Sequence, residues 1–275
     1  MSWSLLSACA RRSVKGAQLT SSLPQTSASP IQPTQDQATS MPGFLLLPME
    51  SIAEQVTFAS YDGMQLAGQL DFPPQGEKFD LVFIIHHADP VNRDIYQYLA
   101  AKLVPLGFAV FRFDKRGTGS SAGVYGCCEA EDALAAYRAA VTAQPEKIEK
   151  VFILAQSIGT KHLASQFDSF NEIKPPAGVI LLSSLLSVEE VLEIRAPILI
   201  VISDHEPERI TVSEAAVSAH QNRYPYGANF KVAKNTEHTL FDISQGMIDW
   251  NDPTWTLKFS ADAWDAIRAW LESHR

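Results

Sequence analysis

From Met49 onward, short apolar runs alternate with segments in which apolar residues recur every three or four positions. Apolar runs rich in β-branched residues are typical of buried strands, and the longer spacing is typical of amphipathic helices. The pattern predicts strands at 55–59, 65–71, 81–85, 108–113, 151–155, 177–182, 197–202 and 229–232. It predicts helices at 92–105, 129–142, 160–170, 208–220 and 261–271, with a short helical piece before 197. Strands that alternate with helices indicate an α/β domain with a mostly parallel sheet, an N-terminal antiparallel hairpin and helices on both faces.

Residues 1–48 are predicted to be a disordered tail, and residues 49–275 a single domain. Residues 1–35 are rich in Ser, Thr, Ala, Gln and Pro and contain basic residues but no acidic one. This composition is typical of an organelle transit peptide, and its apolar part is too short for a secretory signal. A plain disordered tail, or a translation start at Met41 or Met49, is the alternative. We therefore expect an intracellular protein, in the mitochondrion or plastid if the tail is a transit peptide and in the cytoplasm otherwise.

Composition and charge limit the partners that the protein can have. The 275 residues carry a net charge of −9, which argues against nucleic acid or an anionic membrane as the main partner. Hydrophobic residues make up 46% of the chain, enough for a large core. No apolar run reaches the roughly 18 residues that a membrane span needs. The three cysteines have neither a disulfide nor a metal-site spacing, and no metal or organic cofactor is expected.

Polar side chains follow the predicted strands at the edge of the sheet where open α/β folds bind ligands. The segments that follow successive strands are His86–Asp89, Asp114–Ser121, Ser157, Ser203–Glu206 and Asn235–Leu240. They contain a serine, then acidic residues, then a histidine. This is the chain order of the serine, acid and histidine in hydrolases built on such a sheet. A serine hydroxyl is a poor nucleophile until a neighbouring base takes its proton, and a carboxylate orients that base.

The serine lies in the pattern A-x-S-x-G, between a predicted buried strand and a predicted helix. The small residues Ala155 and Gly159 stand two positions before and after Ser157. Small residues there let the backbone close a sharp turn that exposes the serine, with the helix N-terminus behind it. The pattern is one residue short of G-x-S-x-G, and the alternative is a serine that only caps a helix.

With these residues in place, the chain from about 50 to 273 resembles the α/β-hydrolase superfamily, in its compact serine-esterase or serine-aminopeptidase-like branch. The most specific match is the motif D-x-R-G-x-G-x-S at Asp114–Ser121, which follows Gly107-Phe108. The chain departs from the family pattern at Ala155 and at His86-His87-Ala88, where the family has H-G-x. The resemblance implies an α/β-hydrolase fold, and the 14 residues between Leu182 and Pro197 leave room for a minimal lid only.

The resemblance also implies roles for individual residues. Ser157 is the expected nucleophile and His238 the expected base. Glu206 stands at the family's acid position, with Asp204 as its rival. Two backbone N–H groups are needed to bind the oxyanion of the tetrahedral intermediate. They are expected from Ile158, which follows the nucleophile, and from Ala88 in the loop after the third strand.

Other residues near the strand ends are expected to be structural. Asp114 and Arg116 would brace their turn by an ion pair and hydrogen bonds, and His86 and His87 would pack or brace their loop. Trp250 and Trp255 either line a pocket or pack the insertion that follows His238, and packing is favoured.

We therefore expect a serine hydrolase that cleaves a small carboxylic ester, thioester or amide through an acyl-enzyme on Ser157. Substrates with short or medium acyl groups are expected, because a minimal lid would shelter a long chain poorly. The alternative is a catalytically inactive α/β-hydrolase-fold protein that binds a ligand or acts as a scaffold, suggested by the missing glycines and the unusual acid. A third possibility keeps the three residues but transfers the acyl group to an alcohol.

Overall fold

A computed structural model of the protein describes residues 43–275. Residues 1–42 of the tail predicted at 1–48 therefore lie outside the described residues. Its last residues lie against the domain: the rings of Phe44 and Trp255 are 5.7 Å apart, and the N–H of Leu47 donates to Gln97 Oε1 at 2.8 Å. The packed part of the chain thus extends further toward the N-terminus than the boundary expected at residue 49.

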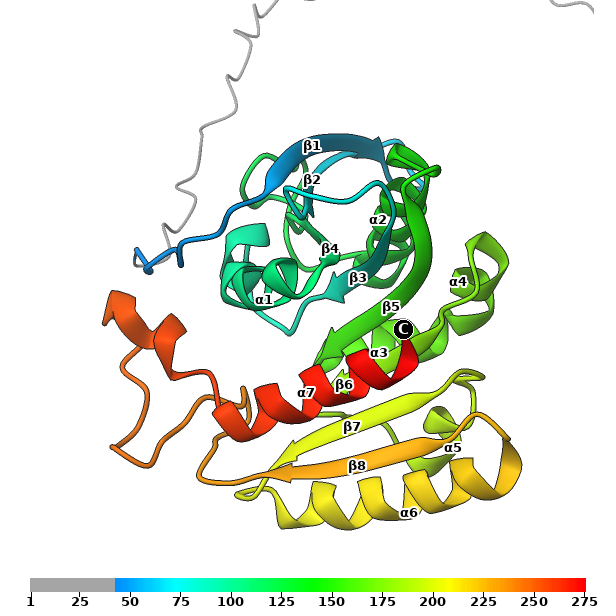
Figure 1. Cartoon of the computed structure of the whole chain (residues 1–275), viewed down its shortest axis with the longest axis vertical. Helices are drawn as coiled ribbons and strands as arrows, with labels where there is room; N and C mark the ends of the chain where they lie inside the picture. The colour runs from blue at the N-terminus through cyan, green and yellow to red at the C-terminus, as the bar shows by residue number, and fades with distance from the viewer. Residues whose placement is uncertain (1–42) are drawn as a thin grey trace, which may run out of the picture. The chain divides into compact units, whose positions relative to one another are not determined.

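A sheet of eight strands runs through the centre of the described residues (Figure 1). Its strands are β1 (Ile52–Ala59), β2 (Gln65–Phe72), β3 (Phe79–Ile85), β4 (Phe108–Phe113), β5 (Ile148–Gln156), β6 (Gly178–Leu182), β7 (Ile198–Ser203) and β8 (Ala228–Ala233). Their order across the sheet is β1-β2-β4-β3-β5-β6-β7-β8. The hairpin β1–β2 is antiparallel and joins β4 antiparallel, whereas every pair from β4 to β8 is parallel. The predicted mostly parallel sheet with its N-terminal hairpin is confirmed.

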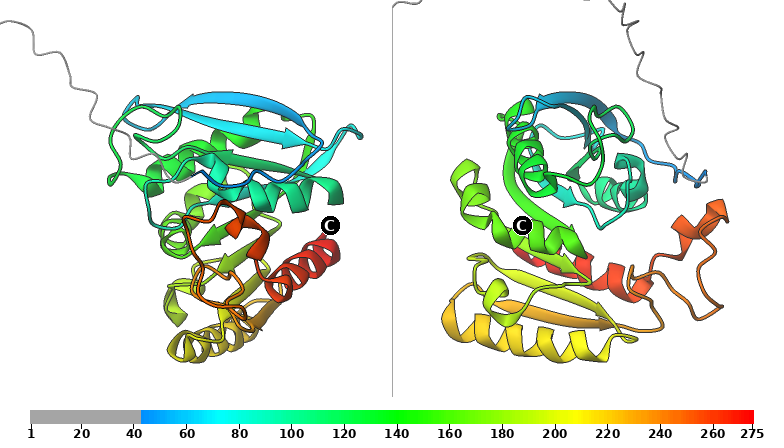
Figure 2. Two further views of the ribbon diagram at one scale, coloured as in Figure 1. Left: turned by 90° about the vertical axis from the view of Figure 1, so that its left-hand side faces the viewer. Right: turned by 180° about the vertical axis from the view of Figure 1, so that it is seen from behind.

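Helices cover both faces of this sheet, as predicted. They are α1 (Gln97–Leu103), α2 (Glu129–Ala143), α3 (Ile158–Ser165), α4 (Phe167–Ile173), α5 (Val188–Val191), α6 (Pro207–Arg223) and α7 (Ala261–His274), with short 3-10 helices at Arg93–Tyr96, Val104–Leu106 and Pro253–Lys258. Buried residues of α2 to α6 belong to one hydrophobic cluster, and those of α1 and α7 to another. Figures 1 and 2 show α6 and α7 on opposite sides of β7 and β8. In the described part of the chain, no helix is both long and apolar enough to cross a membrane.

Two predicted helices are divided in the structure. The helix expected at 160–170 breaks at Gln166, which separates α3 from α4. The helix expected at 92–105 is α1 flanked by two 3-10 turns, the second of which contains Pro105. Proline lacks an N–H group and cannot continue the α-helical hydrogen bonding, so the chain ends its helix there and turns at Gly107 with a positive φ of 88°.

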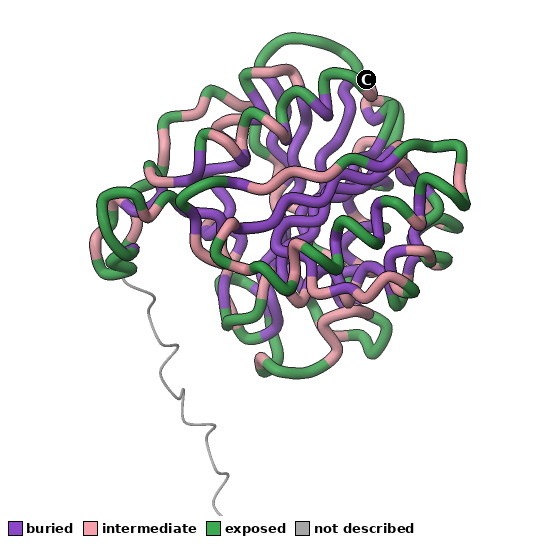
Figure 3. Tube along the Cα trace, turned by 90° about the horizontal axis from the view of Figure 1, so that it is seen from below, coloured by how far each residue is buried: buried purple, intermediate pink, exposed green. Residues whose placement is uncertain are grey.

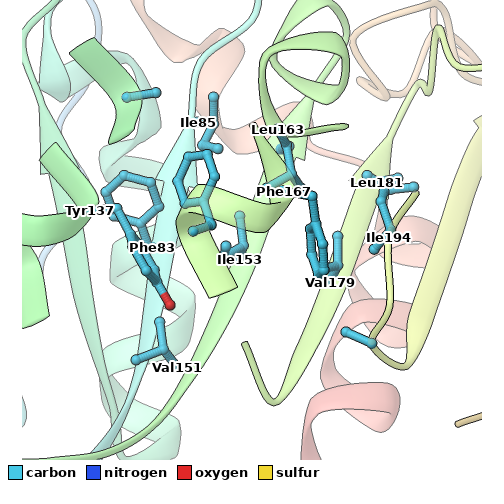
Figure 4. Close-up of a cluster of buried hydrophobic side chains, with 14 of the residues drawn as sticks. Phe83, Ile85, Tyr137, Val151, Ile153, Leu163, Phe167, Val179, Leu181 and Ile194 are labelled. Carbon is cyan, nitrogen blue, oxygen red and sulfur yellow. The ribbon is translucent and has the colours of Figure 1, made fainter. Parts of the chain in front are cut away.

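The core follows from the alternation of side chains along the strands. Leu81, Phe83 and Ile85 of β3 point into the first cluster, whereas Val82 and Ile84 point into the second. Neighbouring residues of a strand face opposite sides of a sheet, so a strand covered on both sides is apolar at every position. Figure 4 shows Phe83 of β3 beside Tyr137 of α2, and Phe167 of α4 beside Val179 of β6. Figure 3 shows the strands as the buried interior.

The strand order reverses between β3 and β5. From β3 the chain moves outward to β4, then crosses back to β5 on the other side of β3. Connections that leave neighbouring strands in opposite directions open a crevice at their carboxyl ends, where open α/β sheets bind ligands. The loop that begins at His86 and the turn at Ser157 therefore flank the crevice of this sheet.

Candidate active site

Ser157 lies at the sharp turn between β5 and α3. Its backbone has φ 54° and ψ −120°, a combination that residues with a side chain rarely adopt. The turn is held by the N–H of Ser157, which donates to the carbonyl of Leu182 on β6 at 2.9 Å. Such a conformation costs on the order of 1–3 kcal/mol, so the surrounding structure has to enforce it. Positive φ at a serine that begins a helix is typical of an exposed nucleophile.

The small residues around Ser157 fit this turn for different reasons. A Cβ atom on Gly159 would lie 2.5 Å from the carbonyl oxygen of His86 and 2.9 Å from that of Ile85, so only glycine fits there. Ala155 is fully buried, and its methyl group is part of the same core cluster as Ile85 and Leu163. An alanine is therefore accommodated at the first small position. The contact of Gly159 also places α3 directly against the loop that follows β3.

The structure brings three of the predicted site residues together. Ser157 Oγ lies 2.9 Å from His238 Nε2, and His238 Nδ1 lies 2.9 Å from Glu206 Oε1. Each residue follows the carboxyl end of a parallel strand: Ser157 follows β5, Glu206 follows β7 and His238 follows β8. When Nδ1 carries the hydrogen and donates to the carboxylate, Nε2 is free to accept the serine proton.

The carboxylate of Glu206 is suited to this contact. Its side chain is largely buried, and Oε1 also forms an ion pair with Arg209, whose Nε lies 3.1 Å away. Burial opposes ionisation, but the hydrogen bond from His238 and the positive charge of Arg209 outweigh it. The pKa of Glu206 is therefore held below its usual value. Glu206 is a carboxylate at neutral pH.

The rival acid Asp204 has a different set of contacts. Its two oxygens accept hydrogen bonds from the N–H groups of Asn235 at 2.8 Å and Thr236 at 3.2 Å. Within residues 43–275, no hydrogen bond joins Asp204 to His238. The neighbouring Ser203 Oγ donates to the carbonyl of Thr236 at 2.6 Å. Asp204 thus holds the start of the loop that carries His238, whereas Glu206 contacts the imidazole itself.

The two backbone groups predicted to bind an oxyanion follow the carboxyl ends of the neighbouring strands β3 and β5. Ile158 begins α3, and Ala88 is an exposed residue in the loop after β3. Neither the N–H of Ile158 nor that of Ala88 donates a hydrogen bond to another group among residues 43–275. Next to Ala88, His86 is buried against the ring of Phe113, with the ring centroids 4.5 Å apart. Burial, with the charge of Lys115 nearby, holds the pKa of His86 well below its usual value, so this histidine is neutral.

A cavity of about 220 Å³ lies between the strand ends and the segment that follows His238. Two of the residues that line it are neighbours of the site residues in the chain: Gln156 precedes Ser157, and Thr239 follows His238. The remaining lining is mostly aromatic and comes from Phe44, Tyr96, Tyr98, Phe241, Trp250 and Trp255, with His87, Asp89 and Ile95. In Figure 1 the orange segment that carries the tryptophans lies at the end of the sheet to which the parallel strands point.

Sequence reasoning missed most of this aromatic lining. Trp250 and Trp255 do pack, with ring centroids 5.4 Å apart, but both also line the cavity. Phe44 falls within the predicted tail, and Tyr98 falls within the predicted helix at 92–105, where nothing in the local pattern indicates a cavity. The lid segment between β6 and β7 contains only the short helix α5, as the chain length there implies. The cover of the cavity therefore comes from the insertion after His238.

Asp114 and Arg116 brace the turn after β4, but through separate partners. Asp114 is paired with Arg93, whose Nη2 lies 2.9 Å from Oδ2. Arg116 Nε lies 2.6 Å from Asp132 Oδ2 on α2, and Nη1 lies 2.7 Å from Asp62. The two side chains leave the strand end toward opposite faces of the sheet, which is why they do not pair with each other. In the described residues, no group of three or more His, Cys, Asp or Glu side chains is placed to hold a metal ion.

Comparisons with known proteins agree with this architecture. The family model "Serine aminopeptidase, S33" matches residues 80–204, which contain β3 to β7 and Ser157. No curated protein matches the chain. An esterase from Pyrococcus furiosus is 14% identical with a TM-score of 0.55, and the match covers 72% of this chain and 91% of the esterase.

Two further solved structures are similar over most of their length. A dienelactone hydrolase-like promiscuous phosphotriesterase from metagenomic libraries is 16% identical, with a TM-score of 0.56 and coverage of 82% of this chain and 96% of that protein. DcsB, solved in complex with its substrate analogue, is 12% identical, with a TM-score of 0.60 and coverage of 82% and 98%. At these identities the similarity shows a shared fold.

Proposed function

We propose that this chain is a serine hydrolase of the α/β-hydrolase superfamily that cleaves a small carboxylic ester, thioester or amide. The observation that carries the proposal is the row of contacts from Ser157 to His238 to Glu206, each 2.9 Å long. The strained backbone of Ser157 supports the same reading, since a serine that only caps a helix needs no such conformation.

In the proposed reaction, Ser157 Oγ attacks the substrate carbonyl carbon while His238 Nε2 takes the hydroxyl proton. The carbonyl oxygen becomes an oxyanion, which accepts hydrogen bonds from the N–H groups of Ile158 and Ala88. His238 then gives its proton to the leaving alcohol, thiol or amine, and the acyl group stays on Ser157. A water attacks the acyl-enzyme with the same base, and the acid product leaves. Glu206 orients the imidazole and stabilises its charged form throughout.

The alternative function, a ligand-binding or scaffold protein without catalysis, needs none of these contacts. It was suggested by the glycines missing from the family motifs. Ala155 occupies its position without displacing the turn, because its methyl group packs in the core. The short contact between Ser157 and His238 favours the enzyme, because a binding site gains nothing from a base beside a serine.

The cavity beside Ser157 favours a compact apolar acyl or leaving group. Its aromatic rings would stack on a planar group or pack around a short chain. The name of the Pyrococcus furiosus protein, an esterase, supports esters as the first substrates to try.

The proposal is tested by hydrolysis of p-nitrophenyl esters that range from acetate to dodecanoate. We expect a burst of p-nitrophenol as the acyl-enzyme forms. We expect kcat/KM to be highest for short or medium chains and to fall at least about tenfold toward dodecanoate. Trp250→Ala, which opens the cavity wall, should move the optimum to longer chains.

Trp264→Ala is the matched control, because Trp264 lies on α7 and does not line this cavity. Its chain-length optimum should equal that of the wild type. Faster hydrolysis of dodecanoate than of butyrate by the wild type would contradict the proposed substrate size. Failure to hydrolyse any ester of the series would favour the binding protein instead.

A further inference from the structure

Lys115 is a buried lysine in the turn after β4. Only 5% of its side chain is exposed. Its ammonium donates to the carbonyl of His87 at 2.6 Å, lies 2.8 Å from Glu129 Oε2 and sits 5.2 Å from the centre of the Tyr125 ring. Burying an ammonium is costly unless each of its hydrogens finds a partner, and these groups supply them. The bond to His87 therefore ties the turn after β4 to the loop after β3.

The carbonyl that Lys115 holds belongs to the same peptide group as the N–H of Ala88. In a trans peptide these two groups point in opposite directions, and the described residues contain no cis peptide. The N–H of His87 is held as well, since it donates to Tyr96 Oη at 2.9 Å. The backbone of His87 is thus fixed on both sides, and the N–H of Ala88 is aimed away from the buried ammonium.

We propose that Lys115 is a positioning residue that orients and polarises the His87–Ala88 peptide, so that the Ala88 N–H can bind the oxyanion of the reaction. This inference rests on the proposed function. Hydrogen bonds from a charged donor are stronger than neutral ones, and a bond to a carbonyl strengthens the N–H of the same peptide as a donor.

Glu129 keeps the lysine in place and connects it to the nucleophile helix. Glu129 begins α2, and its Oε2 also lies 3.7 Å from His162 Nε2 on α3. Burial opposes ionisation of Glu129, but the neighbouring His162 and Lys115 lower its pKa, so it remains a carboxylate. Glu129 therefore lies against both Lys115, which holds the loop after β3, and His162 on the helix that begins at Ile158.

The test is Lys115→Met, which keeps the apolar stem and removes the charge and the hydrogen bond. We expect kcat for a p-nitrophenyl ester to fall about 100-fold, with KM changed less than about threefold. The serine hydroxyl adds to the carbonyl of a trifluoromethyl ketone, and the adduct carries an oxyanion like that of the reaction. The inhibition constant of the ketone should therefore rise by the same factor as kcat/KM falls. A purely structural role would lower the melting temperature without this parallel change.

Arg116→Met is the matched control. Arg116 is the next residue, its side chain is 4% exposed, and it is ion-paired to Asp132 without touching His87. It should lose stability but keep kcat within about threefold of the wild type. If Lys115→Met does not fold, Lys115→Met combined with Glu129→Gln removes both partners of the buried pair and should show the same loss of kcat.

The outcomes separate the two proposals. If the wild type is active and folded Lys115→Met keeps full activity, the role of Lys115 is overturned and the proposed function stands. Equal losses of kcat in Lys115→Met and Arg116→Met have the same meaning. A wild type that neither hydrolyses esters nor binds the ketone overturns the proposed function, and the role of Lys115 with it.

Discussion

Replacing Ser157 by alanine is expected to lower kcat for a p-nitrophenyl ester by about 10⁶-fold. The loss is this large because the acyl-enzyme cannot form without the hydroxyl, and His238 then has no nucleophile to activate. Removing one hydroxyl from this turn leaves the fold intact. The measurement is the steady-state rate at saturating ester, together with a melting curve for each protein.

Ser165→Ala provides the comparison for this variant. Ser165 is on the same helix, α3, and its hydroxyl donates to the carbonyl of His162 at 3.0 Å, away from His238. We expect its kcat to equal that of the wild type. Retention of more than about 1% of kcat by Ser157→Ala would show that another group performs the attack.

Replacing Glu206 by glutamine is expected to lower kcat by about 10⁴-fold. The amide has nearly the shape of the carboxylate, but it can donate a hydrogen to His238 Nδ1 and so favour the tautomer that carries the proton on Nε2. In that tautomer the imidazole cannot take the proton of Ser157. Steady-state rates from pH 5 to pH 9 measure the loss.

Asp204→Asn distinguishes the two acids. Asp204 accepts hydrogen bonds from Asn235 and Thr236 instead of contacting the imidazole, so an amide should weaken the loop and leave the chemistry in place. We expect a kcat loss of no more than about tenfold, accompanied by a lower melting temperature. A larger loss for Asp204→Asn than for Glu206→Gln would mean that Asp204 is the catalytic acid.

The centre of the sheet could be predicted because its strands are covered on both faces. Every residue of β4 is buried, so the apolar run at 108–113 has no competing interpretation. The divided helices were harder. The break at Gln166 follows from how α3 and α4 pack on the sheet, and the apolar spacing at 160–170 continues through it. Helix ends set by packing carry little local signal.

The site could be predicted as far as it depends on strand ends. Ser157 and His238 each follow a strand, and parallel strands end at one edge of the sheet. Asp204 and Glu206 are two positions apart in one loop, and the conformation of that loop decides which of them contacts His238. Spacing in the sequence does not determine this conformation. Phe44 lines the cavity because it packs against Trp255, and Lys115 can be buried because it is paired with Glu129. Both partners come from other segments of the chain. Long-range contacts of this kind leave no local pattern.

The central claim is that Ser157 is an activated nucleophile, and covalent labelling with a fluorophosphonate probe tests it most directly. Wild type and Ser157→Ala would be incubated with the probe, digested and compared by mass spectrometry. We expect one adduct on the wild-type peptide that contains Ser157 and none on the same peptide of the variant. A well-folded wild type that forms no adduct, or an adduct that persists in Ser157→Ala, would contradict the claim.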